Sequence, residues 1–243
     1  MEKTVFQPLY RQAELLLTQA LIAGEWPPGG LIPSEPELAI RFGVSQGTIR
    51  KAIEALRADK LLVRRQGRGT YVATHREEAA QFRFLKLQPD NRPPFGLRSQ
   101  YLDCLRLKCP PDIAVALDLP ANASIVRIRR VLLEKDVVRE KALVFEEINL
   151  PATRFRGLSA ERLSAYQGPL YGLFETEFGV RMVAGEERLK AVIGPKEVCS
   201  ALELADGTPL LFVDRLTLTY DHKPVEVRRG YYLSEGYHYV SKL

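Results

Sequence analysis

The stretch SEPELAIRFGVSQGTIRKAI, residues 34–53, decides the fold of the first part of the chain. Ser34 and Glu37 form a capping-box pattern that begins a short helix, and Gly43 ends this helix. Ser45 caps a second helix, whose apolar residues recur at helical spacing along one stripe. Two short helices joined by a tight glycine-containing turn are typical of a helix-turn-helix.

The segments on both sides of this stretch extend the motif. Residues 8–23 form a helical pattern with one apolar stripe, a proline in the first turn and a glycine after the last turn. Downstream, two short strand patterns, residues 61–66 and 70–73, flank Gly67-Arg68-Gly69. This arrangement predicts a hairpin with a glycine tip and a cation at its apex. A helix, a helix-turn-helix and a basic hairpin in this order predict a winged helix.

Positive charge is concentrated in the same region. The 243 residues carry a net charge of +5, and residues 41–76 alone carry +7. A module that binds a polyanion has this charge distribution, although a basic solvated surface would have it too. The start of the second helix and the hairpin tip offer amide, hydroxyl and guanidinium groups that suit base edges and phosphates. The residues expected to contact DNA are Ser34, Ser45, Gln46, Gly47, Thr48, Arg50, Lys51, Gln66, Gly67, Arg68 and Gly69.

Composition excludes several other classes of protein. Hydrophobic residues make up 46% of the chain and charged residues 27%, which is ordinary for a globular protein. No apolar run approaches the ~20 residues that a membrane-spanning helix needs, and the N-terminus lacks a secretory pattern. Three cysteines and three histidines lie outside any metal-ligand spacing. We therefore expect a soluble, cytoplasmic protein with no membrane segment, no metal and no cofactor.

The second half of the chain repeats itself with an offset of 85 residues. Leu117 and Arg130, for example, correspond to Leu202 and Arg215, and each copy has the pattern of a short helix, a strand, a tight loop and a second strand. One supersecondary unit used twice predicts a pseudo-symmetric sheet that is mixed or antiparallel. Between the copies, residues 169–178 form a helical pattern that ends at Gly179.

Two charged residues interrupt apolar strand faces in the first copy. Alternation places Arg130 with Val126, Ile128 and Leu132, and it places Glu146 on an equally apolar face of the next strand. Each buried charge needs a partner. Arg130 and Glu146 either pair with each other and organise the core, or they recognise a small ligand in an apolar cavity with Arg130 as the anion clamp.

Another set of polar residues lies near the C-terminus. Glu226, Arg228 and Tyr232 share a strand face, which could extend the lining of the same cavity or face solvent.

The N-terminal motifs resemble the DNA-binding domain of the GntR family of bacterial transcription regulators, without gaps from about residue 8 to residue 73. The resemblance rests on LIPSE at 31–35, FGVS at 42–45, TIRKA at 48–52 and RQGRGTYV at 65–72. Two positions depart from the family pattern, Pro36 and Gln46, where that family more often has arginine. Gln46 favours adenine where arginine favours guanine, so the half-site sequence is expected to differ from common operators.

Residues 99–240 resemble the UTRA ligand-sensing domain of the HutC-type branch of this family. The resemblance implies an α+β protein with a winged helix-turn-helix at 1–74, a linker at 75–96 and a chorismate-lyase-like domain with a mostly antiparallel sheet at 97–243. It also implies an effector site at Arg130, Glu146, Glu226 and Tyr232, for a sugar phosphate or a carboxylate. Pro169 and Leu132 replace a hydroxyl residue and an arginine of phosphosugar-sensing members, which leaves an organic carboxylate equally compatible.

These features predict a homodimeric repressor that binds double-stranded DNA at an inverted repeat and responds to a small anionic metabolite. Two alternatives remain open at this point: a lyase-like enzyme domain attached to a DNA-binding module, and a DNA-binding protein that responds to no ligand. The enzyme class lacks support, because the chain has no nucleophile elbow and no phosphate-binding loop. Cys104 and Cys109 could form a redox pair, although buried structural thiols are the commoner outcome.

Overall fold

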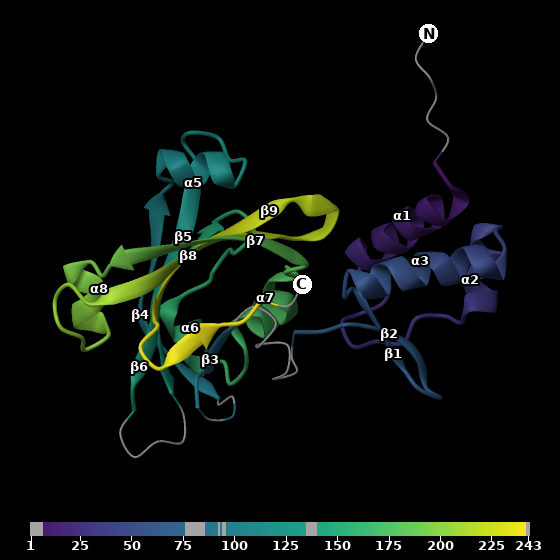
Figure 1. The fold of residues 1–243 in the computed structure, drawn as a ribbon. Coiled ribbons are helices and arrows are strands. Elements are labelled where there is room, and N and C mark those ends of the chain that lie inside the picture. The colour runs from purple at the N-terminus through teal and green to yellow at the C-terminus, as the bar shows by residue number, and fades with distance from the viewer. Residues whose placement is uncertain (1–6, 76–85, 92, 94–95, 135–139, 242–243) are drawn as a thin grey trace, which may run out of the picture. The chain divides into compact units, whose positions relative to one another are not determined.

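The computed structural model describes residues 7–75, 86–91, 93, 96–134 and 140–241. The chain forms two compact units, Met1–His75 and Arg76–Leu243, which are drawn in Figure 1. We call them the N-terminal unit and the C-terminal unit and describe each by itself.

The N-terminal unit is a winged helix, as the sequence predicts. Its elements are α1 (Leu9–Ile22), α2 (Glu35–Phe42), α3 (Gln46–Ala58), β1 (Leu62–Arg65) and β2 (Gly69–Val72). The capping box of α2 is present: the backbone N–H and the hydroxyl of Ser34 both donate to Glu37 Oε2, over 2.7 and 2.6 Å. Gly43 ends α2 in the left-handed region at φ 64°, and Ser45 Oγ accepts a hydrogen bond from the backbone N–H of Thr48.

The hairpin of β1 and β2 is attached to the segment that leads into α2. The backbone N–H of Gly29 donates to Val72 O, that of Val72 donates to Gly30 O, and that of Ile32 donates to Thr70 O. Gly69 is favoured at this contact, because its φ of 102° is a conformation that residues with a side chain rarely adopt. The wing is therefore held in a defined position relative to the helix-turn-helix.

The C-terminal unit contains a six-stranded sheet in the order β4-β5-β6-β9-β8-β7, and every neighbouring pair is antiparallel. Its strands are β4 (Leu97–Lys108), β5 (Ser124–Glu134), β6 (Ala142–Pro151), β7 (Ala184–Ile193), β8 (Pro209–Leu218) and β9 (Pro224–Leu233). Its helices are α5 (Pro111–Ala116), α6 (Ala160–Ala165), α7 (Leu170–Phe178), α8 (Lys196–Ala201) and the 3-10 turn η1 (Tyr220–His222).

The predicted duplication is confirmed by this topology. The bounds of α5 and α8 differ by 85 residues at both ends, and β5 and β8 begin with the same offset. The offset also relates two residues of unusual conformation, Asp118 at φ 51° and Glu203 at φ 56°, which lie just after these helices. The two copies contribute β4-β5-β6 and β7-β8-β9, and they meet where β6 pairs with β9.

Some elements were not anticipated from the sequence. The short helix α6 was missed, and so was the two-stranded sheet of β3 (Leu87–Pro89) and β10 (Tyr237–Tyr239). The apolar segment from Phe82 to Leu87 also predicts one strand near Phe84, and that position lies outside the described residues. β3 falls within residues 75–96, and its Leu87 packs with Tyr237 in the core of the C-terminal unit.

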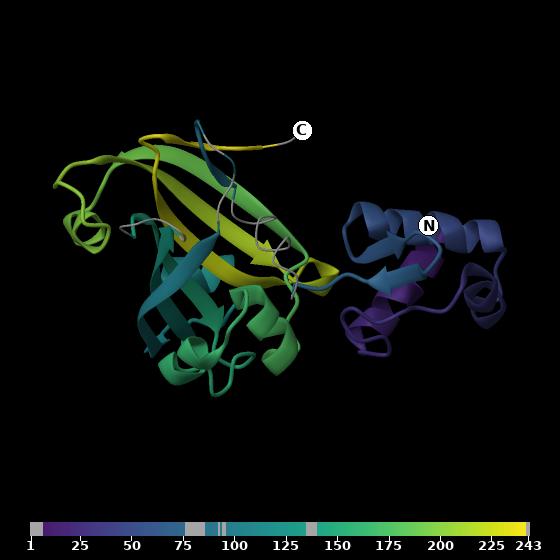
Figure 2. The ribbon, with the colours of Figure 1, turned by 90° about the horizontal axis from the view of Figure 1, so that it is seen from below.

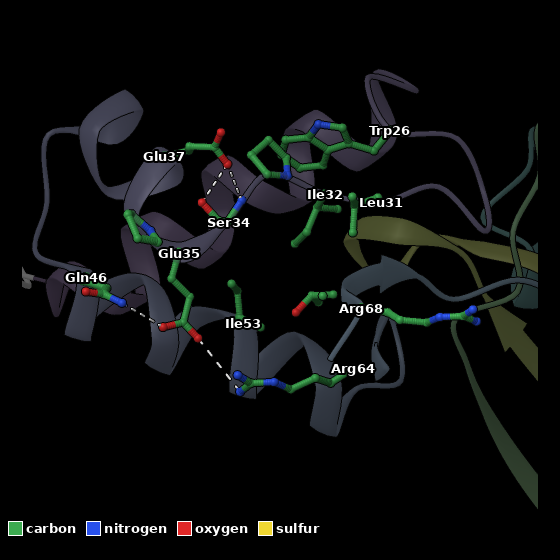
Figure 3. Close-up of a pocket in the computed structure, with 14 residues that line it drawn as sticks. Trp26, Leu31, Ile32, Ser34, Glu35, Glu37, Gln46, Ile53, Arg64 and Arg68 are labelled. Carbon is green, nitrogen blue, oxygen red and sulfur yellow. Dashed lines mark hydrogen bonds and ion pairs between the residues drawn. The ribbon is translucent and has the colours of Figure 1, made fainter. Parts of the chain in front are cut away.

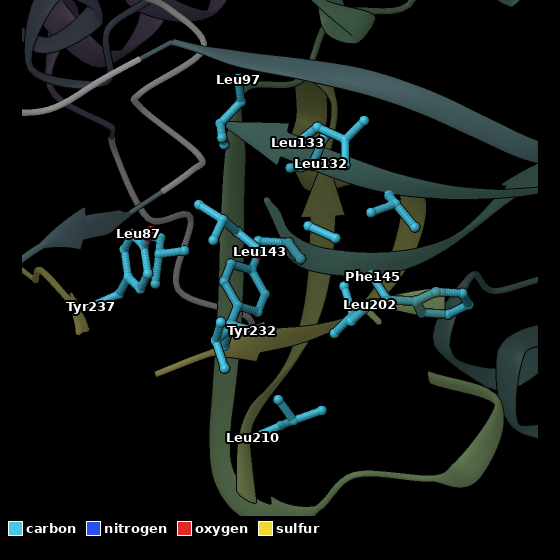
Figure 4. Packing of buried hydrophobic residues seen from close by; sticks show 14 of the residues in the cluster. Leu87, Leu97, Leu132, Leu133, Leu143, Phe145, Leu202, Leu210, Tyr232 and Tyr237 are labelled. Carbon is cyan, nitrogen blue, oxygen red and sulfur yellow. The ribbon is translucent and has the colours of Figure 1, made fainter. Parts of the chain in front are cut away.

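Several apolar clusters pack on the sheet, and two of them bear on the position of Arg130. Figure 4 shows the first, where Leu132 and Leu143 pack with Leu210 and Tyr232. The second is built under α6 and α7, and in Figure 2 these green helices lie on the opposite side of the sheet from the yellow strand β10. Along β5, Ile128 belongs to the second cluster and Leu132 to the first. Arg130 therefore lies where the two clusters meet.

The two units offer a direct test of their independence, because Trp26 is the only tryptophan and is buried in the N-terminal unit. Leu56→Ala removes a buried side chain of α3. We therefore expect it to lower the free energy of unfolding of the N-terminal unit, measured by Trp26 fluorescence in urea, by about 2 to 5 kcal/mol. The matched change Leu163→Ala, in the second cluster, is expected to leave the Trp26 transition in place. A shift of that transition by Leu163→Ala would show that the units unfold together.

Candidate functional sites

The first candidate site begins at the N-terminus of α3. Gln46 and Gly47 occupy the first turn and are exposed, and Arg50 and Lys51 follow one turn later on the surface. The hydroxyls of Ser45 and Thr48 lie 2.8 Å apart at the helix start. These are the residues predicted to reach DNA, and the start of a recognition helix is the part that enters the major groove.

The wing contributes the second part of this site. Gln66, Gly67 and Arg68 form its exposed tip, where the backbone N–H of Arg68 donates to Arg65 O over 2.9 Å. The wing and the helix-turn-helix enclose a cleft of about 610 Å³. Gln46 lines this cleft from α3, and Arg64 and Arg68 line it from the hairpin, as Figure 3 shows.

One acidic residue that the sequence reading did not select lies in this cleft. Glu35 Oε2 accepts hydrogen bonds from Arg50 Nε over 3.0 Å and from Gln46 Nε2 over 3.4 Å, and it lies 2.9 Å from a terminal nitrogen of Arg50. Its other oxygen lies 4.0 Å from Arg64 on β1. The hydrogen bond from Arg50 is the main reason that the pKa of Glu35 is lowered. Glu35 therefore carries its negative charge at neutral pH.

The second candidate site lies inside the sheet of the C-terminal unit. Arg130 Nε donates to Glu146 Oε2 over 2.7 Å, and a terminal nitrogen of Arg130 lies 2.6 Å from the same oxygen. The two residues are directly opposite each other on β5 and β6, and both are buried. The Arg130 guanidinium also donates to Ser99 Oγ, on β4, over 2.9 Å.

A second arginine and a second glutamate complete this buried cluster. Arg228 donates to Glu146 over 3.1 Å and to Glu226 Oε2 over 2.9 Å, so it links the two carboxylates. Glu226 Oε1 also accepts hydrogen bonds from the Tyr171 hydroxyl, over 2.6 Å, and from Thr217 Oγ1, over 3.0 Å. We call Arg130, Glu146, Arg228, Glu226, Tyr171 and Thr217 the polar cluster.

The protonation states in the polar cluster follow from these contacts. Burial opposes the ionised form of Glu146, but the charges of Arg130 and Arg228 outweigh it and lower its pKa to about 2. Burial raises the pKa of Tyr171 to about 12, so its hydroxyl is a neutral donor toward Glu226. Within the cluster, two arginines therefore lie against two glutamates, and the Tyr171 hydroxyl donates to one of them.

Tyr232 lies next to the polar cluster, in the first apolar cluster. Its ring covers Gly230, where a Cβ would come within 2.4 Å of it, and it packs edge-on against Tyr239. Burial and the charge of Glu146 raise the pKa of Tyr232, which keeps its hydroxyl protonated.

A further ion pair lies on the neighbouring strands. Arg215 Nε donates to Glu187 over 2.7 Å, and Glu187 also accepts from Lys86, over 2.8 Å, and from the Tyr239 hydroxyl. Lys86 directly precedes β3, so this contact attaches β3 to the six-stranded sheet.

The structure decides between several alternatives from the sequence. The solvent-facing interpretation of Glu226, Arg228 and Tyr232 is wrong, because all three are buried. The pairing of Arg130 with Glu146 is confirmed. The sequence placed Arg228 on the same strand face as Glu226 and Tyr232, but it did not point to Tyr171 or Thr217 as site residues. The repeat could have identified Arg215, because it is the counterpart of Arg130 at the 85-residue offset.

Other chemistries find no support in the part of the chain that the structure describes. Burial and the nearby charge of Asp103 raise the pKa of Cys104 to about 11, which is opposite to what a reactive thiol needs. Among the described residues, no group of three histidine, cysteine or acidic side chains is placed to hold a metal ion. Within the same residues, no helix combines the length and the apolar character needed to cross a bilayer.

Comparison with known proteins identifies both units. The profile of the gntR family of bacterial regulatory proteins matches residues 9–72, and that of the UTRA domain matches residues 95–238. The HTH-type transcriptional regulator Rv0792c of Mycobacterium tuberculosis is 32% identical, over 93% of this chain and 82% of its own length. The histidine utilization repressor of Pseudomonas putida is 28% identical, over 91% of this chain and 86% of its own.

A solved structure agrees with these matches. The ligand-binding domain assigned to a GntR-family transcriptional regulator of Bordetella bronchiseptica is 45% identical, with a TM-score of 0.61, over 65% of this chain and 96% of that domain. Both the fold and the relatives point to regulation of transcription rather than to catalysis. The chain belongs to the GntR family of bacterial transcription regulators, in its HutC-like branch with a C-terminal UTRA domain, and it is a DNA-binding regulator and not an enzyme.

Proposed function

We propose that the chain is a repressor that binds an inverted-repeat operator through the start of α3 and the wing, and that a small anionic metabolite alters its affinity for that operator. The observation that carries the first part is the common cleft of α3 and the wing, because it presents Gln46 and Arg68 on one surface. The proposed DNA contacts are Ser34, Ser45, Gln46, Gly47, Thr48, Arg50, Lys51, Gln66, Gly67, Arg68 and Gly69. In this proposal residues 1–74 bind DNA in the cytoplasm, residues 75–96 connect the units, and residues 97–243 sense the ligand.

The polar cluster supports an effector site at Arg130, Glu146, Glu226 and Tyr232. Arginine side chains bind carboxylate and phosphate groups through paired hydrogen bonds, and glutamates accept from hydroxyls. A ligand with an anionic group and hydroxyl or amine donors would satisfy both halves of the cluster. This favours organic carboxylates and sugar phosphates over apolar effectors.

We propose further that the regulator is a homodimer paired through β7. The sheet has two edges, and β4 is protected by α6 and by a register shift between Tyr101 and Asp103. β7 pairs with β8 over ten residues without a shift, and its side chains Leu189 and Ile193 are 47% and 69% exposed. A long regular edge with exposed apolar residues invites pairing with another strand, and a two-fold partner gives closed symmetry.

The DNA contacts are tested by Arg68→Ala and Lys51→Ala. We expect each change to weaken binding to the DNA upstream of the regulator's own gene. The slope of log affinity against log salt concentration should fall by about one unit for each lost phosphate contact. Fluorescence anisotropy at several salt concentrations measures both quantities. Arg98→Ala, at an exposed ion pair of the C-terminal unit, is the control that keeps wild-type affinity. Wild-type slopes in both N-terminal variants would contradict the proposed face.

The effector site is tested with a panel of organic carboxylates and sugar phosphates. A compound that binds only the folded protein raises its melting temperature, by an amount that grows with its concentration. We expect Arg130→Ala to abolish this rise and to retain DNA binding without ligand. Arg129→Ala is the matched control, because Arg129 is the neighbouring residue and pairs with Asp103 instead. A wild-type response in a folded Arg130→Ala protein would refute the site, and no response to any compound would favour a regulator without a ligand.

The β7 interface is tested by Leu189→Arg together with Ile193→Arg, because like charges facing each other across a two-fold axis oppose pairing. We expect sedimentation equilibrium to show a dimer for the wild type and a monomer for this double variant. Val115→Arg, at an 84% exposed position on α5, is the control that stays dimeric. A double variant that remains a dimer would place the interface elsewhere.

A further inference from the structure

We propose that Glu35 is a positioning and specificity-determining residue of the DNA-binding face: it orients Arg50 and Gln46 for base recognition and makes binding through phosphates alone less favourable. This inference rests on the proposed DNA contacts and adds a residue with the opposite charge to them.

The position of Glu35 is set by three different elements. It is the first residue of α2, and it contacts Gln46 and Arg50 on α3 and Arg64 on β1. Figure 3 shows its carboxylate between Gln46 and Arg64 inside the cleft. Because Gln46 and Arg50 are four residues apart, their side chains lie on one face of α3 and reach the same oxygen. One carboxylate thus connects the recognition helix to the wing.

The contact leaves Arg50 able to bind DNA. A guanidinium has five N–H donors, and Glu35 occupies the edge formed by Nε and one terminal nitrogen. The remaining donors point away from that edge and are free to reach a base or a phosphate. An arginine fixed in this way loses less conformational entropy when it binds than a freely rotating one, which favours a single geometry.

The negative charge of Glu35 has a second consequence. Residues 41–76 carry a net charge of +7, and Glu35 places a carboxylate among their side chains. Only 16% of its side chain is exposed, so solvent screens it less than it screens a surface acid. A duplex that offers phosphates without the matching base edges must compete with Glu35 for Arg50 and Arg64. Specificity gained by disfavouring the wrong partner is a form of discrimination that proteins commonly use.

A purely structural role predicts a different outcome. As the first residue of α2, Glu35 also interacts favourably with the helix dipole, and ion pairs near solvent contribute little to stability. If that were its whole role, its loss would lower the melting temperature slightly and would change the affinity for all duplexes in parallel.

The test compares Glu35→Gln and Glu35→Asp in the full-length protein. A high-affinity duplex is first selected from a random library with the wild type, and a shuffled duplex of equal length is the non-specific probe. Anisotropy titrations at several salt concentrations then give both affinities and both salt slopes. Glu25→Gln is the matched control, because Glu25 forms an ion pair with Arg41 and does not line the cleft.

We expect Glu35→Gln to bind the shuffled duplex more tightly, with a salt slope steeper by about one unit, since arginine side chains are released to phosphates. The ratio of selected to shuffled affinity should fall at least about fivefold, which is the low end of what one well-placed base contact provides. Glu35→Asp keeps the charge but is one methylene too short to hold Arg50, so it should lose selected affinity without gaining shuffled affinity. Glu25→Gln should keep the wild-type ratio.

Unchanged ratios in both Glu35 variants, with wild-type melting temperatures, would overturn this role of Glu35 and leave the DNA-binding function intact. A parallel change in both affinities would also overturn it, in favour of a purely structural contact. Failure of the wild type to enrich any sequence would instead overturn the proposed operator binding itself.

Discussion

In the six-stranded sheet, the buried carboxylate of Glu146 stays ionised because the guanidinium groups of Arg130 and Arg228 surround it. An isolated buried charge costs far more free energy than a domain can supply, so the strands that carry these residues must meet in one register. β5, β6 and β9 do so, with Arg130 opposite Glu146 and Glu146 opposite Gly230. The absence of a side chain at Gly230 makes room for the ring of Tyr232, which closes the cluster on that side.

The duplication explains how such a cluster arises at this place. Two copies of one unit meet at β6 and β9, so residues near the middle of the sheet come from both copies. Arg130 and Arg215 are counterparts by the 85-residue offset, yet they have different partners, Glu146 and Glu187. The two copies have thus diverged in their charged residues while keeping their helices and turns. Asp118 and Glu203, both with positive φ, preserve the shared turn.

The sequence predicted contacts between residues that are close along the chain better than contacts between residues that are far apart along it. In the N-terminal unit the decisive contacts join residues three or four apart, such as Ser34 with Glu37 and Ser45 with Thr48, and these were predicted. Alternation along one strand also revealed that Arg130 is buried. It could not reveal that Arg228, 82 residues from Glu146 along the chain, would complete the cluster, because that depends on which strands become neighbours. β3 and β10 were missed because each has three residues, too few for a periodic pattern.

Glu35 was missed for a different reason. An acidic residue at the start of a helix is already explained by the helix dipole, so the pattern alone did not draw attention to it.

In both units a carboxylate is held between arginines, but Glu35 keeps 16% of its side chain exposed and Glu146 keeps 1%. At Glu35, a phosphate that takes Arg50 must displace the carboxylate, and nearby water offsets only part of that cost. Inside the sheet, a ligand must supply both an acceptor for Arg130 and a donor for Glu146, or a buried charge loses its partner. In the proposed function, the face of α3 and the wing therefore discriminates between duplexes, and the polar cluster selects one small molecule.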